Sequence, residues 1–181
     1  MTPVQMSQLF RDVECVLHAP GNLTDHNLTE MAIILDYQLP CEVLKNVSRD
    51  VILTLKKKGD RFRNVRLNVI KWVSDEVIIN EVMPLSMLAI GKGFEDYGNY
   101  DNTTCKHLDI LAGKLKQFYA RSKLMILITD GNFNVYDENV FRNHLQPFLH
   151  KKWIWVDTDG NSKGRVSRLS FDANPVKTIK P

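Results

Sequence analysis

Three aspartates stand at the ends of apolar runs, where carboxylates can ligate a cation or transfer a proton. Met-Ala-Ile-Ile-Leu precedes Asp36, Leu-Met-Ile-Leu-Ile-Thr precedes Asp130, and Trp-Ile-Trp-Val precedes Asp157. Uninterrupted apolar runs of this kind are typical of strands that are buried on both faces of a parallel sheet. Because ligands bind beyond the carboxyl ends of such strands, we expect Asp36 and Asp130 to come together at one edge of the sheet.

The segments around these runs predict the elements that position the aspartates. Apolar residues spaced by three and four predict a helix after Asp36, and two β-rich runs after that helix predict a hairpin. The alternation of short strands with amphipathic helices predicts an α/β fold: a three-layer, doubly wound, mainly parallel sheet with one antiparallel edge strand. The expected strands are residues 31–36, 65–73, 77–82, 124–129, 153–156 and, weakly, 165–171, and the expected helices are 41–58, 105–121 and 138–150.

The length of 181 residues fits one domain better than two. We expect residues 1–30 to form an irregular N-terminal lead-in, in which 13–17 are a candidate short strand. A single α/β domain is expected over 31–172. The C-terminal tail, 173–181, is expected to be extended.

Composition narrows the possible partners. With 24 basic and 21 acidic residues the net charge is +3, which is too small an excess to indicate nucleic acid. No stretch approaches the roughly 20 apolar residues that span a bilayer, and the first residues do not resemble a signal peptide. We therefore expect a cytoplasmic location and no membrane partner. The three cysteines match neither a disulfide framework nor a zinc site.

Four features, in order along the chain, resemble the von Willebrand factor type A domain, also called the integrin inserted domain. The first is the apolar strand that ends in Asp36 before a helix, and the second is a Ser-Asp corner at 74–75 in the hairpin. The third is a glycine-containing loop that begins at Gly91 and leads to Thr103 and Thr104. The fourth is the apolar strand that ends in Thr-Asp-Gly at 129–131. The resemblance covers roughly residues 30–160 and implies the same α/β architecture.

The resemblance also implies a metal-ion-dependent adhesion site. In that family an Asp-x-Ser-x-Ser motif, a distant Thr and a distant Asp bind Mg²⁺, which keeps an open position for a partner carboxylate. Asp36 matches the first Asp, Gln38 and Pro40 stand at the two Ser positions, Thr103 matches the Thr, and Asp130 matches the last Asp. A Gln carbonyl oxygen can ligate a hard cation, but Pro40 has no side-chain oxygen. The resemblance thus implies a degenerate site of Asp36, Gln38, Thr103 and Asp130, with Mg²⁺ weakly bound or absent.

The leading functional hypothesis is a non-catalytic module that binds another protein through the carboxyl-end face of the sheet. Asn132, Phe133 and Tyr136, in the loop after Asp130, are the expected partner contacts, because aromatic residues dominate interface hot spots. Intracellular members of the family commonly work inside larger assemblies. The resemblance therefore implies a component of a larger complex.

Several alternatives stay open. A haloacid-dehalogenase-type, Mg²⁺-dependent phosphohydrolase also has an Asp at the end of its first strand, but its second Asp would stand where this chain has Gln38. A purely structural subunit of a larger assembly would bind no ligand at all. Taken singly, Asp36 and Asp130 are each suited to a purely structural role, in which the carboxyl caps the helix or turn that follows.

Overall fold

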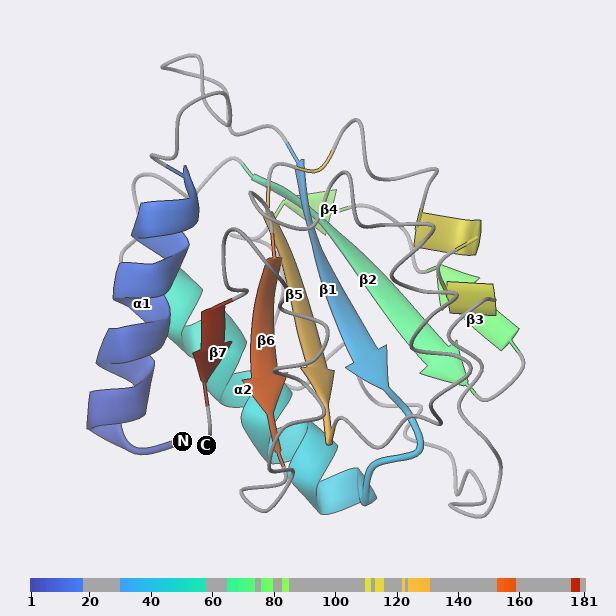
Figure 1. The fold of residues 1–181 in the computed structure, drawn as a ribbon, viewed down its shortest axis with the longest axis horizontal. Coiled ribbons are helices and arrows are strands. Elements are labelled where there is room, and N and C mark those ends of the chain that lie inside the picture. The colour runs from blue at the N-terminus through green and yellow to red at the C-terminus, as the bar shows by residue number, and fades with distance from the viewer. Residues whose placement is uncertain are drawn as a thin grey trace, which may run out of the picture.

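Within the part of the chain that the structure describes, one seven-stranded sheet contains the strands that end at Asp36 and Asp157 and the strand that ends just before Asp130 (Figure 1). The structure, a computed structural model, describes residues 1–17, 30–57, 65–73, 76–79, 83–84, 110–111, 113–115, 122, 124–130, 153–158 and 177–179. Its strands are β1 (Glu30–Asp36), β2 (Arg66–Val73), β3 (Glu76–Ile79), β4 (Met83–Pro84), β5 (Leu124–Thr129), β6 (Trp153–Asp157) and β7 (Lys177–Ile179).

The strand order is β3-β2-β1-β5-β6-β7, with β4 also beside β2. Strands β2, β1, β5, β6 and β7 are mutually parallel, whereas β3 and β4 run antiparallel to β2. The predicted α/β class and the antiparallel hairpin partner of the second strand are therefore confirmed.

The chain changes direction across the sheet between β1 and β5. From β1 it continues outward to β2 and β3, and from β5 it continues outward on the other side to β6 and β7. In open parallel sheets, such a switch point leaves a crevice beyond the carboxyl ends of the two central strands. Asp36 and Asp130 flank this switch point, because Asp36 ends β1 and Asp130 directly follows β5.

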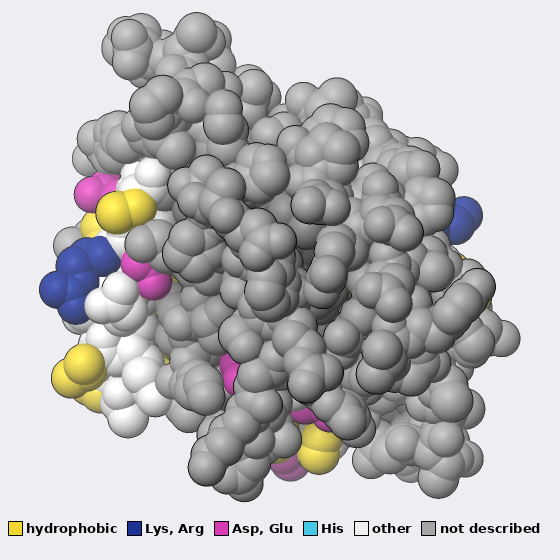
Figure 2. All heavy atoms as spheres, in the orientation of Figure 1, with side chains coloured by type: hydrophobic (Ala, Val, Ile, Leu, Met, Phe, Trp, Pro, Cys, Tyr) yellow, Lys and Arg dark blue, Asp and Glu magenta, His cyan; other side chains and the backbone are white. Residues whose placement is uncertain are grey.

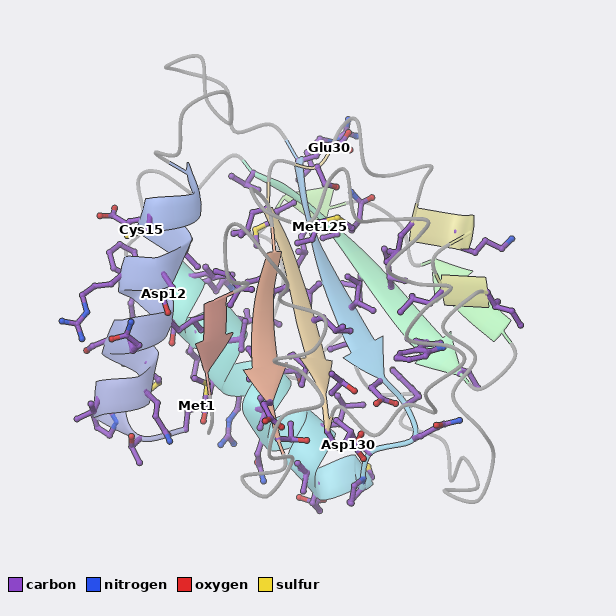
Figure 3. All side chains as sticks on the ribbon, in the orientation of Figure 1. Met1, Asp12, Cys15, Glu30, Met125 and Asp130 are labelled. Atoms are coloured by element: carbon purple, nitrogen blue, oxygen red, sulfur yellow. The ribbon has the colours of Figure 1, made fainter. Side chains whose placement is uncertain are left out.

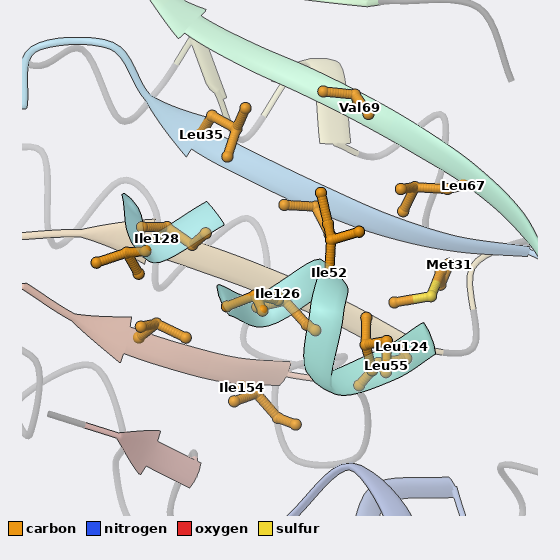
Figure 4. Close-up of a cluster of buried hydrophobic side chains, with 14 of the residues drawn as sticks. Met31, Leu35, Ile52, Leu55, Leu67, Val69, Leu124, Ile126, Ile128 and Ile154 are labelled. Carbon is orange, nitrogen blue, oxygen red and sulfur yellow. The ribbon is translucent and has the colours of Figure 1, made fainter. Parts of the chain in front are cut away.

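Helix α2 (Cys41–Lys57) covers one face of the sheet. Its buried residues Ile52 and Leu55 pack over Met31, Ile126 and their neighbours on adjacent strands (Figure 4). Each such side chain contributes about 1.5–3 kcal/mol when fully buried. The helix was predicted over 41–58, and its lysines in the last turn, Lys56 and Lys57, lie where cations stabilise a helix end.

Asp36 points to the other face of the sheet. Successive strand residues alternate between faces. Met31, Ile33 and Leu35 belong to the core on the α2 side, so Ala32, Ile34 and Asp36 face away from it. These three residues are also fully buried, which explains the uninterrupted apolar run in the sequence.

The expectation of an irregular segment over residues 1–30 is wrong for residues 3–17, which form helix α1 (Pro3–Leu17). The candidate short strand at 13–17 is the last part of this helix. Thr2 and Gln5 form a reciprocal capping box: the Gln5 amide donates to Thr2 Oγ1 at 3.3 Å, and the Thr2 amide donates to Gln5 Oε1 at 2.6 Å. Pro3 follows the cap at the position where proline is best tolerated.

Helix α1 packs through a narrow apolar stripe. Leu9 and Val13, four residues apart, are fully buried, and the helix contacts α2 and the strands β5, β6 and β7. Its other face is exposed. Over α1, Figure 2 shows apolar, basic, acidic and polar side chains side by side, and the exposed residues there include Val4 and Arg11. Because the exposed side chains are mixed, the described face of α1 offers no single-type binding patch.

The remaining predictions fall partly outside the described residues. Residues 110–111 and 113–115 are helical, in agreement with the helix expected over 105–121, and Leu111 and Leu115 are fully buried. In the tail, the expected extended segment includes β7. The predicted helix at 138–150 and the weak strand at 165–171 lie outside the described residues, and the domain bounds 31–172 stay a prediction.

Candidate functional site

The carboxyl ends of β2, β1, β5 and β6 form one edge of the sheet. Figure 3 places Asp130 at this edge and Glu30 at the opposite, amino-end edge. Asp36 lies opposite Trp72 on β2, and Thr129 lies opposite Asp157 on β6. Leu35 lies opposite Ile128, so Asp36 and Thr129 are the next residues of neighbouring strands. The fold thus aligns four side chains in one row across four strands.

The carboxyl group of Asp36 is held on both oxygens by the protein. The Thr129 hydroxyl donates to Asp36 Oδ2 at 2.7 Å, and the Gln38 amide nitrogen donates to Asp36 Oδ1 at 3.1 Å. Asp36 and Thr129 are both 0% exposed. A buried carboxyl is costly unless it is hydrogen-bonded, so these two donors stabilise Asp36 inside the protein.

The turn from β1 into α2 is anchored to its neighbours. The Leu39 amide donates to the Asp36 carbonyl at 3.2 Å, and the Tyr37 amide donates to the Trp72 carbonyl on β2 at 2.9 Å. Lys71 adds a further contact, since its ammonium lies 5.5 Å from the centroid of the Tyr37 ring. The position of Asp36 is therefore fixed by backbone contacts as well as by its own side chain.

Pro40 immediately precedes α2 and caps it with its backbone. The Leu44 amide donates to the Pro40 carbonyl at 3.0 Å, the first hydrogen bond of the helix. The Pro40 carbonyl is thus used within the fold, and its side chain offers no oxygen.

Asp157 adds a second buried carboxyl to the row. It is 1% exposed and lies on β6 opposite Thr129. The Thr158 amide donates to the Thr129 carbonyl at 2.9 Å, which continues the β5–β6 pairing past the end of β6. Thr129 therefore lies between two aspartates, Asp36 and Asp157, and its hydroxyl donates to Asp36.

Asp130 differs from both of these aspartates because it is partly exposed. It directly follows Thr129, so the structure does bring the β1 and β5 ends together, as the sequence predicts. Gln38 is buried, at 7% exposure, in the turn after β1. Of the other predicted site residues, Thr103, Asn132, Phe133 and Tyr136 lie outside the described residues.

The described residues do not fit the Mg²⁺ site of adhesion-type domains. Mg²⁺ requires octahedral oxygen ligands and usually keeps several waters, so it needs accessible oxygens and space. Asp36 is fully buried with both oxygens hydrogen-bonded, and Pro40 contributes no side-chain ligand. Among the described residues, no group of three or more His, Cys, Asp and Glu side chains is arranged to hold a metal ion.

Thr129 is the site residue that sequence reasoning missed. It appears in the sequence only as the residue before Asp130, and a threonine in a strand is ordinary. The Thr-Asp-Gly motif contains Thr129, but the contact of Thr129 with Asp36 requires that β1 and β5 are neighbours. The sequence predicts that these strand ends come together, but the register that places Thr129 beside Asp36 follows from the strand pairing, which a single sequence does not display.

No model of a known protein family matches this chain, and no curated protein matches it. Within the described residues, every helix is too short or too polar to cross a bilayer.

Proposed function

We propose that this chain is a von Willebrand factor type A-like module that binds another protein through the carboxyl-end face of its sheet. One observation carries the proposal: β1 and β5 are neighbours at the switch point of a mainly parallel sheet, where the buried Asp36 ends β1 and the partly exposed Asp130 follows β5. The antiparallel edge strand β3 and the helix that directly follows β1 also agree with a type A-like, three-layer, doubly wound architecture.

The proposed face consists of the strand ends and the residues that follow Asp130 in the sequence. Asp130 is the partly exposed carboxyl of the edge, so it is the acidic group best suited to meet a partner. Asn132, Phe133 and Tyr136 follow within six residues and supply an amide and two aromatic rings. Aromatic side chains with a polar rim are the usual composition of a protein-binding hot spot.

Burial of Asp36 argues against the phosphohydrolase alternative. A nucleophilic aspartate must reach its substrate, and Asp36 is 0% exposed with both oxygens hydrogen-bonded. Position 38, where that chemistry needs an acid or base, holds the amide Gln38. A binding role does not require Asp36 or Gln38 to react.

The test is affinity capture from the native cell with the full chain as bait. We expect the double variant Phe133→Ala/Tyr136→Ala to lose partners that the wild type recovers. Arg66→Ala is the matched control, because Arg66 is exposed at the amino end of β2, on the opposite edge of the sheet. Equal recovery of all partners by the wild type and the double variant would exclude the proposed face.

A further inference from the structure

Asp36 lies at the carboxyl-end edge of the sheet, and its surroundings do not fit a metal site. Its carboxyl therefore has a different role. Asp36 keeps the position of a ligand in the resembled family, yet it is held by a hydroxyl from β5 and a backbone amide from its own turn. Two donors on a fully buried carboxyl give a fixed geometry that requires no ion. Two protein groups thus hold the Asp36 carboxyl at the β1–β5 edge.

We propose that Thr129 is the positioning residue of this face, and that its hydrogen bond to Asp36 makes the face independent of divalent cations. Thr129 reaches across from β5 to β1 and so joins the two strands of the switch point. Through Asp36 it also fixes the Gln38 amide and therefore the turn that leads into α2. The use of this ordered edge for partner binding rests on the proposed function. The positioning role of Thr129 is independent of that function.

Thr129→Val and Thr129→Ser separate the hydroxyl from the shape of the side chain. Valine keeps the branched shape that suits a buried strand and removes only the donor, whereas serine keeps the donor. Hydrogen exchange at the Gln38 amide reports directly on the Asp36 contact. We expect Thr129→Val to accelerate this exchange about ten- to a hundred-fold, because a buried carboxyl oxygen of Asp36 loses its donor. Thr129→Ser is expected to retain most of the protection.

A general loss of stability is distinguished by a remote amide. The Val51 amide lies in the middle of α2, where exchange requires global opening. We expect Thr129→Val to accelerate exchange at Val51 only by the factor that corresponds to its loss of global stability, and to accelerate exchange at Gln38 by more. Equal protection of Gln38 in the wild type and Thr129→Val, or equal acceleration at Gln38 and Val51, would overturn the positioning role.

Cation independence is tested with Mn²⁺ alone, followed by electron paramagnetic resonance on the full chain. We expect no saturable binding by the wild type up to millimolar Mn²⁺. Saturable binding that is lost in Asp130→Ala would overturn the proposal, because it would show that a cation occupies this edge. Neither readout involves a partner, so a failure here leaves the partner-binding face standing, and failure of partner capture leaves the role of Thr129 standing.

Discussion

The Thr129–Asp36 hydrogen bond is expected to contribute measurably to the free energy of unfolding. The bond is 2.7 Å long and both residues are 0% exposed, so water cannot replace the lost donor in the folded state. Removal of the donor leaves a buried carboxyl oxygen unsatisfied, which costs about 1–3 kcal/mol. In Thr129→Val the additional buried methyl group offsets about 0.8 kcal/mol of this loss. We therefore predict a net destabilisation of at most about 2 kcal/mol for the single variant.

A double-mutant cycle isolates the pair from these other effects. Thr129→Val, Asp36→Ala and the double variant are compared with the wild type by urea unfolding, followed by circular dichroism. Loss of the Gln38 contact and the cavity left by Asp36→Ala cancel in the cycle, so the coupling energy is expected to be about 1–3 kcal/mol. A coupling energy below about 0.5 kcal/mol, the range of simple additivity, would refute the structural role assigned to this bond.

Three further predictions concern the cap, the core and the alternative chemistry. Thr2→Ala removes the α1 cap and is expected to cost about 1 kcal/mol in urea unfolding, whereas Ser7→Ala, on the exposed side of the same helix, should cost clearly less. Asn68 is fully buried; its Nδ2 donates to the Met31 carbonyl at 3.4 Å and to Glu30 Oε2 at 3.5 Å, whereas within the described residues its Oδ1 has no hydrogen-bond partner. Because both bonds are long and valine removes the unsatisfied oxygen, Asn68→Val should cost no more than about 1 kcal/mol in urea unfolding, and a loss above about 2 kcal/mol would contradict this expectation. No turnover of a generic phosphate ester is expected; turnover that disappears in Asp36→Asn would revive the phosphohydrolase.

The central strands were predictable from the sequence because their burial leaves a direct signal. Strands β1 and β5 are covered on both faces, so nearly every residue is apolar and each run stops where the strand stops. That signal also located Asp36 and Asp130 at the ends of their strands. The amphipathic spacing in α2 was equally direct, since one face packs on the sheet and the other is exposed.

Helix α1 and the Asp36 contact were missed for different physical reasons. In α1 only a narrow stripe around Leu9 and Val13 is buried, so the periodic signal is weak, although the Thr-Pro-Val-Gln start is a recognisable capping box. The contact between Thr129 and Asp36 joins residues 93 positions apart in the chain. Its existence depends on the register of β1 and β5, which local sequence patterns do not encode.

Site-specific photo-crosslinking in the native cell tests whether the carboxyl end of the sheet binds a partner. A photoreactive amino acid replaces Tyr136, six residues after Asp130, or, as the matched position, Arg66 at the opposite, amino-end edge. We expect a discrete protein adduct from position 136 and none from position 66, and we expect the adduct to form also in a lysate treated with a chelator. Adducts only from position 66, or equal adducts from both positions, would contradict the proposed binding face.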